Sequence, residues 1–353
     1  MEASTASKRF TSDKVREFFL TYALYIILGV MIVVVVCINP KFLYITNIMK
    51  ILQQASTRGI LALGVAGMIV LAGTDLSVGR IVGASAAVTA SLVQSTSYAS
   101  RMWPDLPQLP LIVPLLASIA VAMFFCCING FGVAFLKLHA FIVSLGTQLI
   151  AYGVTCIYIS SQAGGAQAIS TFDQNFINLV NGGVQITGDV GIPAFNNITI
   201  PYLIFYFAIA AVAMWFVWNK TALGKNMFAI GGNTEAAAVS GVSVKKNIMG
   251  VYIVAGVLYG VASFLEAGRI QSVNTQTGLN YDLDAISGCV IGGVSFSGGV
   301  GTIPGVVIGV ILLQVINYSL SFLGVNPYLQ YIIKGLIIIL AVSIDVRKYL
   351  AKK

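Results

Sequence analysis

Long apolar runs separated by short polar stretches make up most of the chain. The first covers residues 20–38, and the others cover residues 58–73, 78–95, 111–136, 139–160, 200–218, 247–267, 282–298, 303–323 and 329–345. A helix crosses a bilayer core about 30 Å thick with about 20 apolar residues, and most of these runs approach that length. The pattern therefore predicts an all-α integral membrane protein, a polytopic bundle of about ten transmembrane helices.

Two places leave the helix boundaries open. Between the first two runs, apolar residues recur at helical spacing, at Phe42, Ile45, Ile48, Met49 and Leu52. This spacing favours an amphipathic helix near the outer interface, and the alternative is an early start to the second span. The second and third spans are also short, so a segment near 58–95 is a candidate for a re-entrant helix.

The positions of the basic residues orient the predicted spans. Ten crossings place both termini on one side, and fourteen of the 20 Lys and Arg residues fall on that side. Because basic loops stay in the cytoplasm, this side is predicted to be cytoplasmic. The chain divides accordingly into a cytoplasmic tail (1–19), a transmembrane domain (20–345) with an outer loop (161–199) and a cytoplasmic loop (219–246), and a second tail (346–353).

The composition excludes a soluble domain. Hydrophobic residues make up 58% of the 353 residues and charged residues 9%, whereas a soluble domain carries about 25% charged residues. The net charge of +8 comes from basic residues that stand singly or in pairs, so no basic face for nucleic acid is expected. Five cysteines in apolar runs and a single histidine, His139, lack metal-ligand spacing, so no metal or other cofactor is expected.

Small residues recur every four positions in several predicted spans, which lets helix backbones approach closely. The repeats are Gly79 and Gly83, Gly256 and Gly260, Gly288 and Gly292, and Gly301, Gly305 and Gly309. They predict a tightly packed bundle and carry no information about a substrate.

Two glycine-rich segments resemble each other: Gly73-Thr-Asp-Leu-Ser-Val-Gly79 and Gly293-Val-Ser-Phe-Ser-Gly-Gly299. Each separates one predicted span from the next, and glycine-interrupted segments at corresponding places of two halves often mark a transport path. Both copies run in the same direction, so an inverted five-plus-five repeat would not pair them. The candidate pathway residues in these segments are Asp75, Ser77, Gly79, Ser297 and Gly299.

Polar side chains within the spans are further pathway candidates. Asn129, Gln148 and Asn317 each carry a carboxamide that donates and accepts hydrogen bonds, as a hydroxylated solute requires. An equally weighted interpretation is that these residues, together with Gln314, form hydrogen bonds between helices.

Acidic residues near the spans are few, and all of them fall close to predicted helix ends. They are Asp75, Glu266, Asp282 and Asp284. A proton-coupled carrier is expected to bury carboxylates centrally in the bilayer, so this placement argues against one. The alternative for each carboxylate is a helix cap or a partner for Arg80 or Arg269.

Glycine-rich stretches raise the question of a nucleotide site. The phosphate-binding pattern G-x-x-x-x-G-K-[ST] fails because Asn219 takes the place of the first glycine and Asn226 follows Gly224-Lys225. If transport consumes ATP, another chain must hydrolyse it, and the chain itself is not expected to be an enzyme.

The cytoplasmic loop 219–246 is the most informative polar segment. Asn233 is a good N-cap, Glu235 suits the positive first turn of a helix and Gly241 suits the position just past its end. A short helix over 234–240 is predicted. Its alanines, Ala236 and Ala237 among them, leave a slim face that can enter a groove on another protein.

The run Glu235-Ala236-Ala237-x-x-x-Gly241 resembles the E-A-A-x-x-x-G coupling loop of ABC importer permeases. Over residues 20–350 the chain looks like the ribose/arabinose/galactose branch, and residues 219–345 are most similar to its galactose/methyl-galactoside permeases. The consensus proline of I-x-L-P is missing from Val251-Tyr-Ile-Val254, a departure typical of this branch. Supporting stretches are Gly73 to Gly79, Ala229-Ile-Gly-Gly-Asn233, Leu265-Glu-Ala-Gly-Arg-Ile270, Gly292 to Gly301 and Val325-Asn-Pro-Tyr328.

The resemblance implies a bacterial inner-membrane homodimer, two ATPase subunits docked on its coupling loops and a periplasmic sugar-binding protein. It assigns the coupling role to Asn233, Glu235, Ala236, Ala237 and Gly241. The alternative function is a proton-coupled or facilitative secondary sugar carrier, with Asp75 or Glu266 as the coupling carboxylate. A membrane enzyme is poorly supported, because no nucleophile with a base and an orienting group is recognisable.

Overall fold

A computed structural model describes residues 29–162, 164–186 and 198–350, and within them the chain is predominantly helical. Five of the described helices are long and apolar enough to cross a membrane: α4 (Ile112–Ala134), α5 (Ala140–Ser160), α7 (Tyr202–Lys220), α10 (Val244–Ile270) and α12 (Ile303–Phe322). The prediction of an apolar helical bundle is confirmed, and these five helices match five of the predicted spans within three residues at each end.

The remaining long segments are also helices. They are α2 (Ile45–Val70), α3 (Val78–Leu92), α11 (Tyr281–Ile291) and α13 (Pro327–Leu350), with a helix at Gly29–Ile38 and a 3-10 turn, η1 (Pro40–Leu43), ahead of them. The predicted N-terminal tail (1–19) and the first part of the predicted first span (20–28) lie outside the described residues.

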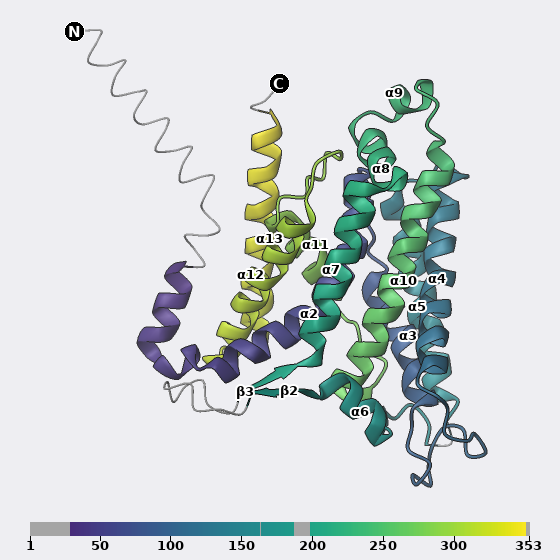
Figure 1. The fold of residues 1–353 in the computed structure, drawn as a ribbon, viewed down its shortest axis with the longest axis vertical. Coiled ribbons are helices and arrows are strands. Elements are labelled where there is room, and N and C mark those ends of the chain that lie inside the picture. The colour runs from purple at the N-terminus through teal and green to yellow at the C-terminus, as the bar shows by residue number, and fades with distance from the viewer. Residues whose placement is uncertain (1–28, 163, 187–197, 351–353) are drawn as a thin grey trace.

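The bundle has two distinct ends (Figure 1). One end carries α8 (Ala222–Gly232) and α9 (Thr234–Val239), and it is called the α9 end below. The opposite end, the α6 end, carries α6 (Gln174–Asn181) and two small antiparallel pairs. These pair β1 (Ile169–Ser170) with β4 (Ser272–Val273), and β2 (Gly183–Ile186) with β3 (Ile198–Pro201). Helix α6 lies in the predicted outer loop 161–199 and buries Phe176 and Val180.

The structure decides between the two interpretations of residues 42–52. A single helix runs from Ile45 to Val70, so the early start of the second span is correct and the separate amphipathic helix is wrong. The segment contains no proline, and Ile51 and Ala55 already face the core, so nothing stops the helix before residue 58. Phe42 in η1 packs its ring on Tyr318 and Phe322 of α12.

The predicted span over 282–298 is wrong in its second half. Helix α11 has 11 residues and ends at Ile291, because Gly293 adopts a left-handed conformation with φ of +82°. Helix α3 is also short, with 15 residues. Neither helix alone has the length of an ordinary membrane span, which takes about 20 residues.

Close helix packing follows the predicted glycine repeats. A Cβ atom on Gly256 or Gly260 would meet the backbone of α4, and Ser118 of α4 donates a hydrogen bond to the Gly260 carbonyl oxygen at 2.8 Å. In the same way, Gly288 and Gly309 bring α11 and α12 into backbone contact. In these two helix pairs the glycine repeats therefore allow the close backbone approach that their spacing predicts.

Candidate functional site

Two short helices begin inside the bundle and meet there. Helix α3 follows α2 and runs from the α9 end towards the α6 end, where Val93 and Ser95 bond to the segment 171–173. Helix α11 follows α10 and runs the opposite way. The two helices are in backbone contact near their starts: a Cβ atom on Gly79 would overlap the Gly278 carbonyl oxygen. Two helix N-termini, each with a partial positive charge, are thus brought together in the interior.

Asp75 lies fully buried in the segment between α2 and α3. Its Oδ1 accepts a hydrogen bond from the Ser77 backbone N–H at 2.8 Å and another from the Ser77 hydroxyl. Its Oδ2 accepts from the Tyr259 hydroxyl of α10 at 3.3 Å. The Asn129 amide of α4 donates to Ser77 Oγ at 2.8 Å. Three predicted pathway residues therefore come together, with Gly79 two residues further on.

Asp75, Ser77, Asn129 and Tyr259 form one hydrogen-bonded cluster, called the Asp75 cluster below. Its hydrogen bonds join three segments of the chain, so the alternative role of Asn129 in helix–helix bonding is realised. Asn129 Oδ1 is buried and has no hydrogen-bond partner among the described residues. The cluster fixes the break before α3 through hydrogen bonds to α4 and α10.

The other predicted pathway residues lie elsewhere. Gln148 is on α5 and Asn317 is on α12, neither in the Asp75 cluster. Ser297 and Gly299 lie in the segment between α11 and α12 at the α9 end, where the Gly299 N–H donates to the Val70 carbonyl oxygen at 2.8 Å. The two glycine-rich segments thus meet at the end of α2, although each has a different environment.

A buried ionic network joins α2, α10, α11 and α13. Glu266 accepts from Nε and Nη2 of Arg269 at 2.7 Å each, from Arg58 at 3.3 Å and from the Tyr281 hydroxyl at 2.5 Å. The Arg58 guanidinium also stacks on the Tyr281 ring, 3.0 Å from its centroid. The predicted alternative of Arg269 as the partner of Glu266 is therefore confirmed.

The network continues from Arg58 to Asp284, which lies 3.5 Å from Arg58 Nε and 3.2 Å from Lys334 Nζ. Arg58 and Lys334 were not among the predicted site residues. A lone basic residue within an apolar segment is itself a signal, because it requires a partner or water in a membrane. Arg80, in contrast, bonds the Thr275 carbonyl oxygen and lies over the Tyr152 ring rather than pairing with a carboxylate.

Helix α9 has the predicted caps. Asn233 Oδ1 accepts from the Ala236 N–H at 2.9 Å, and Gly241 has a φ of +85°. The predicted helix over 234–240 is confirmed as Thr234–Val239. Glu235 and Ala236 are exposed, whereas Ala237 is buried and holds α9 on the bundle.

Helix α8 was not predicted, and it connects α9 to the bundle. Thr221 caps it by accepting from the Gly224 N–H at 3.3 Å. Near its end, a Cβ atom on Gly231 would overlap the Val70 carbonyl oxygen and approach the Gly299 nitrogen to 2.7 Å. The end of α8 is therefore in backbone contact both with the end of α2 and with the segment between α11 and α12.

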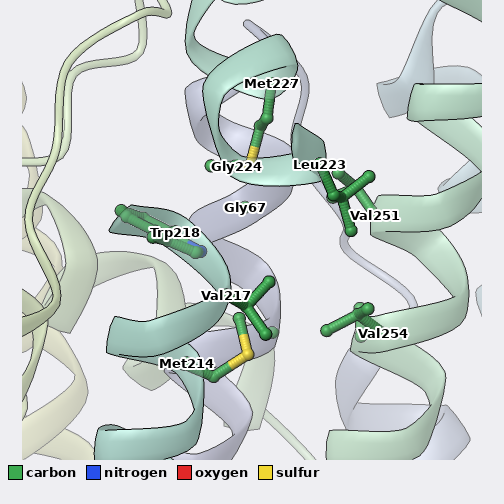
Figure 2. Close-up of a pocket in the computed structure, with 11 residues that line it drawn as sticks. Gly67, Met214, Val217, Trp218, Leu223, Gly224, Met227, Val251 and Val254 are labelled. Atoms are coloured by element: carbon green, nitrogen blue, oxygen red, sulfur yellow. The ribbon is translucent and has the colours of Figure 1, made fainter. Parts of the chain in front are cut away.

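A small apolar cavity, with a volume of about 10 Å³, lies under α8 between α2, α7 and α10 (Figure 2). Met227 and Leu223 of α8, Met214 and Trp218 of α7, and Val251 of α10 line it. It lacks the convergent polar groups that a hydroxylated ligand requires.

Helices that break inside an apolar bundle, with their ends meeting in its interior, are typical of membrane transport proteins. By fold and site the chain is a helical membrane transport protein. The profile of the family described as "Branched-chain amino acid transport system / permease component" matches residues 47–342, and the chain belongs to this family.

Sugar permeases are among its relatives. The galactose/methyl galactoside import permease protein MglC of Haemophilus influenzae is 45% identical, over 94% of this chain and 95% of that protein. The protein of the same name from Escherichia coli K12 is 46% identical, over 96% and 98%. The ribose import permease protein RbsC of E. coli K12 is 33% identical, over 92% of each chain. These matches confirm the predicted resemblance, and they do not favour a secondary carrier. No solved structure matches the chain.

Proposed function

We propose that this chain is the membrane-spanning permease subunit of an ATP-driven importer that carries galactose, methyl galactoside or a related sugar into the bacterial cytoplasm. The names of the relatives support the sugar, since two galactose/methyl galactoside permeases match nearly the whole chain. We place the protein in the inner membrane with ten crossings and the α9 end in the cytoplasm. The basic residues Lys137, Lys220 and Lys245 beside the loops of that end support this orientation.

The observation that carries the ATP-driven mechanism is α9 itself. It is a capped helix of six residues that projects from the bundle, with Glu235 and Ala236 exposed and a Val239 side chain that is 90% exposed. A helix this short is marginal in water, and an exposed valine at its end favours a partner surface. We propose that an ATPase subunit receives this surface, with Glu235 facing a basic group.

Helix α8 provides the route by which ATP-driven motion reaches the interior. Because Gly231 touches Val70 and the Gly299 segment, a displacement of α9 shifts the breaks that follow α2 and α11. Asn233 and Gly241 hold the two ends of α9, and Ala237 anchors it. A second copy of the chain and a sugar-binding protein at the α6 end complete the proposed transporter.

Reversing a charge on α9 tests this function. In the complete transporter, Glu235→Arg is expected to lower sugar-stimulated ATP hydrolysis about tenfold or more, the loss expected for placing like charges together at an interface. Asp105→Arg is the matched control, because Asp105 is an exposed carboxylate in a loop at the opposite end. Both variants should retain the bundle, as judged by monodisperse purification.

The comparison between the two reversals decides the outcome. Normal sugar-stimulated hydrolysis in Glu235→Arg would contradict the coupling role of α9. Equal losses of ATPase co-purification in Glu235→Arg and Asp105→Arg would also contradict it, because a change at the α6 end should leave ATPase docking intact. Concentrative sugar uptake by the permease alone in liposomes would overturn the ATP-driven mechanism as a whole.

A further inference from the structure

A second cavity lies between α11, α12 and α13, which are side by side in Figure 1. Its volume is about 210 Å³, smaller than the sites of about 300–1,000 Å³ that hold drug-sized ligands. Its polar lining consists of Asn280, Asp284, Ser287, Tyr331 and Lys334, and Leu313 and Gly335 are among the apolar and small residues beside them. This lining is unlike the apolar cavity under α8.

Polar groups at this position need an explanation, because charges facing lipid are costly. Asp284 and Lys334 are partly exposed, with side chains 12% and 24% accessible, in a chain that has few charged residues. Tyr331 is 52% exposed. Such groups favour a space filled by water or a polar solute over one filled by lipid chains.

The carboxylate is held in place from behind. Arg58 Nε lies 3.5 Å from Asp284 Oδ2, and the Arg58 guanidinium is itself held by Glu266 and the Tyr281 ring. Lys334 of α13 donates a hydrogen bond to the other carboxylate oxygen of Asp284, Oδ1, at 3.2 Å. One partner of Asp284 is therefore fixed and buried, whereas the other belongs to the cavity wall.

This rests on the proposed function: we infer that the cavity is a binding station for a monosaccharide during its passage through the membrane. Sugar hydroxyls donate to the Asp284 carboxylate and accept from the Lys334 ammonium and the Asn280 amide. The Tyr331 ring packs against the C–H face of the sugar, as an aromatic side chain does with an apolar surface. The start of α11 at Tyr281 places this station beside the contact between Gly79 and Gly278.

The test uses the complete transporter with its ATPase and binding protein in liposomes, and galactose as the probe. Tyr331→Ala and Lys334→Met each remove one cavity group. Each variant is expected to lower galactose uptake about tenfold, the loss for one good contact, while ATP hydrolysis stays within about twofold. The number of sugars moved per ATP therefore falls.

Tyr328→Ala is the matched control. Tyr328 lies on the same helix, its side chain is 78% exposed and it does not line the cavity. This variant should transport at the wild-type rate. Equal sugar-to-ATP ratios in Tyr331→Ala, Lys334→Met and Tyr328→Ala would overturn the binding station.

The wild-type transporter separates this proposal from the proposed function. If it takes up no galactose and none of the related sugars, the proposed function fails. If it takes up galactose and the cavity variants retain the wild-type ratio, the proposed function stands and the binding station fails. A lower number of sugars moved per ATP in the cavity variants alone supports the binding station.

Discussion

Gly79 and Gly278 lie backbone against backbone where α3 and α11 begin, and a Cβ atom on either residue would overlap the carbonyl oxygen of the other. Gly278 also has a φ of +85°, which disfavours any residue with a side chain. The contact joins two helices that enter the interior from opposite ends. It sets how far each helix reaches into the bundle and therefore where the interior breaks lie.

The first prediction concerns this contact. Gly278→Ala is expected to destabilise the protein by about 1–2 kcal/mol through the left-handed backbone and by about 1–3 kcal/mol more through overpacking. Gly324→Ala is the control, because Gly324 has a φ of +69° but nothing within 4 Å of its Cβ position. Thermal unfolding of the purified protein should show the larger loss at Gly278, and equal losses would mean that the contact contributes nothing.

The second prediction concerns the end of α8. Gly231→Ala places a methyl group against Val70 and the Gly299 segment, whereas Gly232→Ala meets nothing within 4 Å. Gly231→Ala should therefore displace α9 and lower sugar-stimulated ATP hydrolysis several-fold, while Gly232→Ala leaves it unchanged. Measuring hydrolysis with and without sugar separates this effect from a general loss of ATPase activity. If the two adjacent variants behave alike, the backbone contact does not transmit motion.

Local signals were sufficient to predict α9 and most membrane spans. Asn233 and Gly241 act on their own helix, so the caps can be found without knowing what the helix touches. Hydropathy likewise finds a helix such as α4 because nearly every residue in it is apolar. The start of α2 was predicted only as an alternative, because Lys50 and its polar neighbours look like the face of a surface helix, although the helix continues through them.

Contacts between distant segments could not be predicted from either signal. Arg58 and Glu266 are 208 residues apart, and neither position by itself indicates the other. The same limit applies to Gly79, because no local pattern indicated its backbone contact with Gly278. The Asp75 cluster was predicted in part because a carboxylate among apolar residues is conspicuous, although its partner Tyr259 was not.

The third prediction concerns Asp75. Asp75→Asn keeps the size of the side chain and replaces one acceptor oxygen by an amide that cannot accept from Tyr259 or Ser77. We expect the variant to assemble and to transport sugar about tenfold more slowly, in line with the loss of one hydrogen bond to a charged group. Uptake and purified yield should be measured together. A normal uptake rate would mean that the charge is not needed and that the cluster serves packing.

The fourth prediction concerns the buried network around Glu266, whose side chain is 1% exposed between Arg58 and Arg269. Glu266→Gln leaves both guanidinium groups without their shared carboxylate, and breaking a buried pair in this way costs about 3–5 kcal/mol. Arg269→Met is expected to destabilise the protein less, because Arg58 still neutralises Glu266. The double variant should lose less stability than the two single losses added together, since the second change removes a charge that the first has already left unpaired. Strictly additive losses in thermal unfolding would show that Glu266 and Arg269 do not interact.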